Sequence, residues 1–319
     1  MSLKTQTYYP GLDAIRGVLI ILVVLSHCLS PGTPVFILYS FHMPLFLGIG
    51  GFLIKRDYIR NTSTFQILHK YLYRMIIPWI LAVCIYYLWR RLLSIPVDSQ
   101  HEILYPYYHL WFVPALLGMV LSVKLLEYWN ISYKVVLGAS MLLCLGWYIL
   151  YREHPDNMIY PWLYYLGDKR IYGYFGFFYL GYVLRAYPDV FPKVKMHYVL
   201  LAAGVSLSLL IVSVYFPVDR LVSFLPYWVL NIGLIYWAIV YASEQTLTKN
   251  SFILFCNKQS LAIYLYHYSV ILLASSFLTI KGPLTVALFL ITVIATYLTV
   301  YLTSSLPFVN KYFFGYTKA

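Results

Sequence analysis

Charged residues are scarce in this sequence. Asp, Glu, Lys and Arg make up only 11% of its 319 residues, against about 25% in soluble globular domains. Hydrophobic residues account for 61%, and the mean hydropathy is +0.73. This composition excludes a soluble globular fold, and the abundant apolar surface also excludes disorder. The composition therefore predicts an integral membrane protein.

Several common signals are also missing. The four cysteines each lie in an apolar stretch, so we expect neither disulfides nor a zinc site. We find no glycine-rich phosphate loop, dinucleotide fingerprint, nucleic-acid-binding motif or internal repeat. The first apolar run leads into Ser26-His27-Cys28 and a Pro-Gly turn instead of a small-residue cleavage site, so we expect a retained span. Residues 1–319 are expected to form a single transmembrane domain without a separate soluble domain.

Long apolar stretches fill the chain. They are continuous, without the alternation of a β-barrel strand, which predicts an all-α polytopic fold with about ten transmembrane helices. The stretches are Leu12–Leu29, Val35–Ile54, Met75–Leu93, His109–Leu126, Tyr133–Leu150, Tyr165–Arg185, Tyr198–Phe216, Leu221–Ala242, Ser260–Leu278 and Leu284–Leu306.

The distribution of basic residues predicts the orientation. If the N-terminus is cytoplasmic, most of the 23 Lys and Arg residues fall on the cytoplasmic side, as the positive-inside rule requires. Both termini are then expected to be cytoplasmic. The net charge of +12 is explained by topology and contact with anionic lipid, so no nucleic-acid partner is needed.

The first stretch contains ionisable residues that are costly in a bilayer core. Arg16 and His27 are eleven residues apart, about three helical turns, so they share one helix face and lie about 16 Å apart along the axis. Asp13 precedes Arg16 by three residues and can pair with it. This pattern predicts either one wall of a functional cavity, or a snorkelling arginine and a histidine satisfied between helices.

Three further histidines occur in other spans: His42 in the second, His109 at the start of the fourth, and His267 in the ninth. All are expected in the outer half or near the middle of the membrane. A lone buried histidine is usually a satisfied polar group, but four at similar depth favour a shared cavity. None has a second His or Cys at helical ligand spacing, so no metal site is expected.

The segment Lys55–Arg74 is rich in basic residues and holds one acid, Asp57. We expect a cytoplasmic loop near the inner mouth of any cavity lined by Arg16. A phosphate-rich ligand would bind well there, although charge alone favours ordinary positive-inside bias. Gly48, Gly50 and Gly51, within the second span, are expected to allow close helix packing or a kink near Pro44.

Recognisable motifs occur from the first span to the ninth. They are Leu12-Asp13-Ala14-Ile15-Arg16-Gly17 followed by His27, Phe41-His42-Met43-Pro44-Leu45-Phe46 leading to Gly51-Phe52-Leu53, Arg74 four before Pro78, His109-Leu110-Trp111-Phe112-Val113-Pro114, Tyr179-Leu180-Gly181-Tyr182, and Ser260 with Ile263-Tyr264-Leu265-Tyr266-His267. Together they resemble the acyltransferase-3 family of multi-pass membrane O-acyltransferases. Similar members are bacterial and transfer an acyl group, usually acetyl from acetyl-CoA, to a sugar hydroxyl of a surface polysaccharide or its lipid-linked precursor.

The resemblance implies roles for individual residues. His27 is the essential catalytic histidine, with Arg16 as its partner and Asp13 beside Arg16. His27 either removes the proton of the attacking hydroxyl or first accepts the acetyl group itself. The donor's phosphates would be held by Arg16, Lys70, Arg74 and Arg56. His42, His109, Trp111, Tyr264 and His267 would line the acceptor pocket or reacting centre.

One departure concerns the donor site. Many members have a closely spaced pair of arginines after the second span, where this chain has Lys70 and Arg74. Because lysine lacks the bidentate fork of arginine, donor affinity and identity are less firmly predicted than the catalytic residues.

The resemblance also implies a location and partners. We expect acetyl-CoA as a donor substrate, no tightly bound cofactor, a glycan or lipid-linked sugar as acceptor, and a place among the lipids of the bacterial cytoplasmic membrane. The alternatives are a transporter or flippase of a glycan or lipid intermediate, and a catalytically silent partner of an export complex. The sequence identifies neither the sugar nor the oligomeric state.

Overall fold

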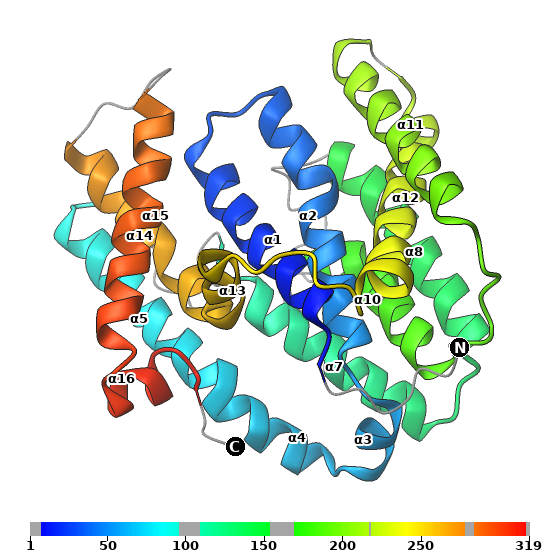
Figure 1. Ribbon diagram of the computed structural model, residues 1–319, viewed down its shortest axis with the longest axis horizontal. Coiled ribbons are helices and arrows are strands. Elements are labelled where there is room, and N and C mark those ends of the chain that lie inside the picture. Colours follow the sequence, from blue (N-terminus) through cyan, green and yellow to red (C-terminus); the bar gives the residue numbers. More distant parts are fainter. Residues whose placement is uncertain (1–7, 96–108, 154–168, 217, 278–283, 317–319) are drawn as a thin grey trace. The chain divides into compact units, whose positions relative to one another are not determined.

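A computed structural model describes residues 8–95, 109–153, 169–216, 218–277 and 284–316 (Figure 1). All regular elements within these ranges are helical, which confirms the predicted all-α class. They are α1 (Pro10–Cys28), α2 (Thr33–Phe52), α3 (Arg56–Asn61), α4 (Thr64–Tyr71), a π-helical segment η1 (Leu72–Ile76), α5 (Ile77–Leu92), α7 (Phe112–Tyr128), α8 (Tyr133–Glu153), α10 (Lys169–Ala186), α11 (Met196–Tyr215), α12 (Arg220–Tyr236), a second π-helical segment η2 (Trp237–Ala242), α13 (Ser251–Lys258), α14 (Ser260–Phe277), α15 (Leu284–Thr303) and α16 (Pro307–Tyr312).

Within the described ranges, the predicted apolar stretches coincide with helices, and six helices are long and apolar enough to cross a membrane; residues 165–168 and 278 of two stretches lie outside these ranges. These six are Pro10–Cys28, Thr33–Phe52, Thr64–Leu92, Met196–Tyr215, Leu221–Ala242 and Thr285–Thr303. The other four stretches fall on α7, α8, α10 and α14, which are shorter in their apolar part or more charged. The apolar parts of α8 and α14, for example, are Tyr133–Ile149 and Ser260–Ser276. Helices of this length and composition indicate a membrane protein.

Two local expectations are wrong. The segment Lys55–Arg74 is not a loop, because α3, α4 and most of η1 lie within it. Helix α4 starts at a capping box in which Ser63 and Gln66 bond each other's backbone amides, a readable signal that the polar composition concealed. In the fourth stretch, His109 lies in a turn before the helix, which begins at Phe112. Pro114 then occupies the first helical turn, where its missing N–H breaks no helical bond.

The contacts divide the chain into two compact groups of helices. One, here called the α10 group, comprises Met1–Ile15, Pro31–Thr62 and Gly118–Asn250. The other, here called the α14 group, comprises Arg16–Ser30, Ser63–Leu117 and Ser251–Ala319. Each group is assembled from three separate segments of the chain, so neither corresponds to one half of the sequence. The expectation of one domain over residues 1–319 stays a prediction.

Glycines bring α2 and α10 together in the α10 group. A Cβ on Gly181 would lie 1.8 Å from the carbonyl oxygen of Gly48, and one on Gly51 would lie 1.9 Å from the carbonyl oxygen of Phe178. Backbone at that distance leaves no room for any side chain, so the two helices pack through their glycine faces. The predicted role of Gly48 and Gly51 in close packing is confirmed.

A buried asparagine compensates for Pro44 in the middle of α2. Proline has no N–H, so the carbonyl of Ser40 loses its partner in the helix. The side-chain amide of Asn231, on α12, donates to that carbonyl at 2.8 Å and also to the carbonyl of Tyr227 at 2.8 Å. Asn231 is fully buried. It therefore supplies the hydrogen bond that α2 cannot supply itself.

In the α14 group, α14 packs beside α15 and also contacts α5 (Figure 1). Helix α4 continues through η1 into α5, and the amide of Ile77 bonds the carbonyl of Leu72 five residues earlier. Pro78 follows directly. Because proline has no N–H, it cannot donate the i+4 hydrogen bond to the carbonyl of Arg74. The chain end packs on this group: Phe314 clusters with Ala262 and Val300.

Candidate active site

Three of the four predicted histidines meet inside the α14 group. His27 comes from α1, His267 from α14, and His109 from the turn before α7. The His27 and His267 rings stack with centroids 5.0 Å apart, and the His109 ring lies 6.0 Å from that of His27 and 5.2 Å from that of His267. His109 and His267 are almost completely buried, whereas His27 is half-buried. The half-buried ring is therefore the one that solvent or a ligand can approach.

The hydrogen bonds of His267 assign the proton positions of the pair. Its Nδ1 lies 2.9 Å from the carbonyl oxygen of Ile263, which can only accept, so Nδ1 carries the hydrogen. The Nε2 of neutral His267 is then an acceptor, and the His27 Nδ1 2.7 Å away must donate to it. Neutral His27 consequently has its lone pair on Nε2. This assignment follows from the hydrogen-bond network, and it makes Nε2 of His27 the atom able to take up a proton.

The turn that carries His109 is held by Tyr264. The Tyr264 hydroxyl donates to the carbonyl of His109 and accepts from the amide of Phe112 at 3.0 Å. The Phe112 amide belongs to the first turn of α7, where backbone donors have no helical partner. The indole of Trp79 donates to the carbonyl of Leu110 at 2.9 Å. Tyr264, expected only as a general pocket residue, thus makes a defined structural contact at the site.

Trp111 lies within the same fixed turn and is buried. Its ring contacts that of Phe112 edge to face, with centroids 6.1 Å apart. This places Trp111 in the segment beside the histidines, as the motif predicts, and gives it a packing contact.

Two tyrosines that the sequence did not single out complete the cluster. The ring of Tyr86, on α5, lies 4.9 Å from that of His109, and the ring of Tyr268 lies 5.1 Å from His109 and 5.8 Å from His27. Among 35 tyrosines, neither was distinguishable by type. The position of Tyr268 directly after His267 was the one available signal.

The predicted donor residues are partly gathered in the α14 group. Arg16 lies on α1 eleven residues before His27, as expected, and is half-buried. Lys70 and Arg74 are exposed and lie about one turn apart on the continuous helix that includes α4 and η1. All three side chains therefore belong to elements of the same group as the histidines.

Arg56 belongs instead to the α10 group, where Glu127 binds it. The Nε of Arg56 lies 3.2 Å from a carboxylate oxygen of Glu127, and the Nε of Arg60 lies 3.1 Å from the same oxygen. The hydroxyl of the fully buried Tyr182 donates to the other oxygen at 2.8 Å. These contacts give Arg56 a structural role on α3.

The remaining two predicted residues also belong to the α10 group. His42 is buried, its Nδ1 donates to the carbonyl of Leu38, and its ring contacts Tyr39. These contacts are those of a satisfied core histidine. Asp13 is half-buried on α1, three residues before Arg16. Within the described ranges, no group of three or more His, Cys, Asp or Glu side chains could hold a metal ion.

Comparisons with known proteins agree with the motifs. Residues 9–304 match the family described as an acyltransferase domain. Nodulation protein NolL of Mesorhizobium japonicum is 29% identical over 145 residues, which cover 39% of this chain and 39% of that protein. Nodulation protein NolL of Sinorhizobium fredii is 29% identical over 149 residues, which cover 41% of this chain and 40% of that protein. The match thus spans about two fifths of the length of these curated relatives.

No solved structure matches the chain. The family match nevertheless covers nearly all of it and includes the segments that bring His27, His109 and His267 together. The chain belongs to the acyltransferase-3 family.

Proposed function

We propose that this protein is a membrane O-acyltransferase that transfers an acyl group, acetyl from acetyl-CoA, to a sugar hydroxyl of a surface polysaccharide or lipid-linked glycan. The observation that carries the proposal is the hydrogen bond between His27 and His267, because it leaves the lone pair of His27 on Nε2. A sugar hydroxyl is a weak nucleophile at neutral pH and needs such a base. The family membership supports the reaction class.

In the proposed reaction, the hydroxyl oxygen attacks the thioester carbonyl while its proton moves to Nε2 of His27. The carbon–sulfur bond then breaks, and the coenzyme A thiolate takes up the proton from the imidazolium. His267 accepts the Nδ1 hydrogen of His27 throughout, which holds the ring in one tautomer and orientation. In the alternative route, Nε2 attacks the thioester first and forms an acyl-histidine, which would give a burst of released coenzyme A before steady turnover.

The donor would approach along α1. Arg16, Lys70 and Arg74 would hold its phosphates, because cationic donors bind phosphate strongly. Arg16 and His27 lie at opposite ends of about three helical turns, roughly 16 Å, a distance suited to the long pantetheine arm. We further propose a single transmembrane domain of ten spans with both termini cytoplasmic, in a bacterial cytoplasmic membrane. The coincidence of the predicted apolar stretches with helices supports this topology.

The test follows label from acetyl-CoA into the glycan and glycolipid fractions of membranes that contain wild-type protein, His27→Ala or His197→Ala at matched expression. His197 is an exposed histidine on α11 and serves as the control. Transfer should fall by about 10²- to 10⁴-fold in His27→Ala, the usual contribution of a general base, and stay unchanged in His197→Ala. Equal transfer by all three proteins would remove His27 from the chemistry. Movement of an unlabelled glycolipid across the membrane without any acyl transfer would instead favour a flippase.

A further inference from the structure

The α14 group has an unusual charge balance. Its described residues include several arginines and lysines but no Asp or Glu. The cations are Arg16, Lys70, Arg74, Arg90, Arg91, Lys258 and Lys311. In the predicted orientation, positive-inside bias explains these charges except Arg90 and Arg91, which lie in the last turn of α5. It does not explain why some of them are held close to one another.

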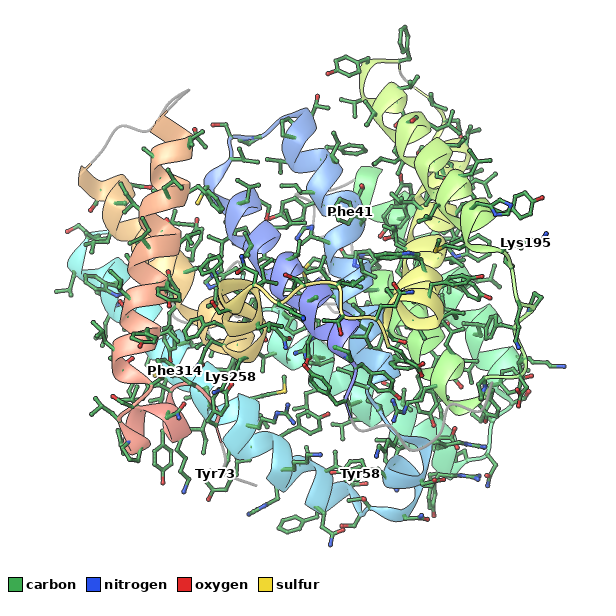
Figure 2. All side chains as sticks on the ribbon, in the orientation of Figure 1. Phe41, Tyr58, Tyr73, Lys195, Lys258 and Phe314 are labelled. Atoms are coloured by element: carbon green, nitrogen blue, oxygen red, sulfur yellow. The ribbon has the colours of Figure 1, made fainter. Side chains whose placement is uncertain are left out.

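The last described residues of the chain pack directly on Arg74. Gly315 has φ +71°, and a Cβ at this position would lie 2.0 Å from the carbonyl oxygen of Arg74. Because the residue four positions later is Pro78, this carbonyl has no i+4 amide from which to accept a hydrogen bond. Only glycine combines that backbone conformation with so close an approach. The neighbouring Phe314, labelled in Figure 2, is buried against Ala262 and Val300 and anchors the segment.

Tyr316 then connects Lys258 to the same place. Its hydroxyl donates to the carbonyl of Lys258, and the ammonium of Lys258 lies 6.0 Å from the centre of its ring. Burial raises the pKa of the Tyr316 phenol, and the positive charges of Arg74 and Arg16 act in the opposite direction. Tyr316 therefore joins Lys258 of α13 to the place where Gly315 packs on the η1 backbone at Arg74.

These cations are also accessible. Arg74 and Lys258 are exposed and Arg16 is half-buried. Within the described ranges, the ion pairs join Glu127 to Arg56 and Arg60, and no carboxylate neutralises Arg74 or Lys258. Positive charges that no carboxylate neutralises favour a ligand with two or more negative charges.

We propose that Arg74 and Lys258, together with Arg16 of the proposed donor site, form one binding site for a diphosphate or phosphate ester beside the segment Phe313–Tyr316. Lys258 binds the phosphate directly, and Tyr316 is a positioning residue that holds Lys258 beside Arg74. The identification of the occupant as the diphosphate of an acyl-coenzyme A donor rests on the proposed function. The headgroup of an anionic lipid has the same chemistry and is the other source to be tested.

The experiment measures binding and leaves transfer aside. Full-length protein in phosphatidylcholine nanodiscs is titrated with coenzyme A and with S-acetylpantetheine, which has the same arm but no phosphate. The variants are Lys258→Ala, Lys258→Arg and Tyr316→Phe. The control is Lys195→Ala, an exposed lysine of the α10 group labelled in Figure 2. In parallel, nanodiscs that contain phosphatidylglycerol report on competition by lipid headgroups.

Lys258→Ala should weaken coenzyme A binding by about tenfold, the equivalent of one hydrogen bond to a charged group, and leave S-acetylpantetheine binding unchanged. Lys258→Arg should restore it, and Tyr316→Phe should weaken it without lowering the melting temperature. Lys195→Ala should bind like wild type. If the wild type shows this pattern but transfers no acyl group, the proposed reaction fails and the phosphate site stands.

Equal coenzyme A affinity in Lys258→Ala and Lys195→Ala would overturn the donor assignment. If Lys258→Ala then lowers only the retention of phosphatidylglycerol, the phosphate belongs to a lipid. If neither ligand responds to Lys258→Ala, there is no phosphate site at this position.

Discussion

In the proposed reaction, His267 acts on His27 without needing to touch substrate. Its Nδ1 is committed to the carbonyl of Ile263, so its Nε2 can only accept from His27. A change at His267 should therefore impair the chemical step and leave substrate binding intact.

We predict that His267→Phe lowers kcat by on the order of 10²-fold or more with little change in KM for acetyl-CoA. Phenylalanine keeps the ring packing against His109 and Tyr268 but offers no acceptor to His27. His267→Gln, whose amide oxygen can accept, should recover part of the loss. Steady-state kinetics on both variants checks this, and a wild-type kcat in His267→Phe would contradict the dyad.

In the α10 group, the carboxylate of Glu127 binds Arg56 and Arg60 and accepts a hydrogen bond from Tyr182. We expect Glu127→Ala to lower stability by about 1–3 kcal/mol, mainly because the buried Tyr182 hydroxyl loses its acceptor. The side chains of Arg56 and Arg60 are 33% and 40% exposed, so solvent screening makes their share smaller. Thermal unfolding in detergent measures the effect, with Asp57→Ala as the control because Asp57 is an exposed acid on the same helix as Arg56.

At the scale of elements, helix α2 of the α10 group needs a hydrogen bond from one neighbouring helix and a close backbone contact with another. Pro44 breaks a hydrogen bond in α2 that Asn231 on α12 repairs, and glycines on α2 and α10 each admit the backbone of the other helix. Substitutions in one helix of each pair test both contacts, through their effect on the stability of the folded protein.

For the repaired bond, we predict non-additive costs. Asn231→Leu should destabilise the wild type by about 1–3 kcal/mol, because the Ser40 carbonyl is left buried without a partner. In the Pro44→Ala background the helix makes that bond itself, so Asn231→Leu should cost less, with a coupling of about 0.5–3 kcal/mol. A double-mutant cycle of unfolding free energies gives the answer. Additive costs would show that Asn231 does not compensate for Pro44.

For the helix contact, Gly181→Ala should prevent α2 and α10 from packing and strongly reduce the yield of folded protein, because overpacking against backbone has no flexible neighbour to relieve it. Gly138→Ala is the matched control. Gly138 lies on α8, and a Cβ added there would meet nothing within 4 Å, so alanine should stabilise the helix by about 0.5–1 kcal/mol. Size-exclusion profiles and melting temperatures of the two variants make the comparison.

At the scale of the whole molecule, the distribution of basic residues predicts the orientation in the membrane. We expect a cysteine introduced by Lys195→Cys, in a background without native cysteines, to be protected from a membrane-impermeant maleimide in intact cells, whereas Arg220→Cys reacts. The positive-inside rule places these positions on opposite sides. Both cysteines should react after permeabilisation, which controls for access. Reaction of Lys195→Cys in intact cells would reverse the proposed orientation.

Much of the fold was predictable because hydropathy alone identifies apolar helices. The predictions were wrong where the composition of a segment did not indicate its secondary structure. Helix α4 is amphipathic and polar enough to read as a loop, although its capping box at Ser63 could have revealed it. The start of α7 was misplaced because His109 and Trp111 continue an apolar run through a turn.

The site was predictable as a set of residue types and not as a geometry. Sequence placed four histidines at similar depth, but only tertiary packing separates His42 from the three that meet. Tyr86, Tyr268 and Tyr316 were hidden among many similar tyrosines. The direction of the His27–His267 hydrogen bond depends on the Ile263 carbonyl, a backbone group that no side-chain pattern reports.

The long sequence separation between His27 and His267 also has a consequence for biosynthesis. The two hydrogen-bonded residues are 240 positions apart. At about 5–20 residues per second of translation, the nascent chain holds His27 for roughly 12–48 s before His267 has been made. During that time the membrane contains a first helix with its histidine but no dyad. The ribosome must therefore complete most of the chain before any copy can form the pair, and prematurely terminated chains never acquire it.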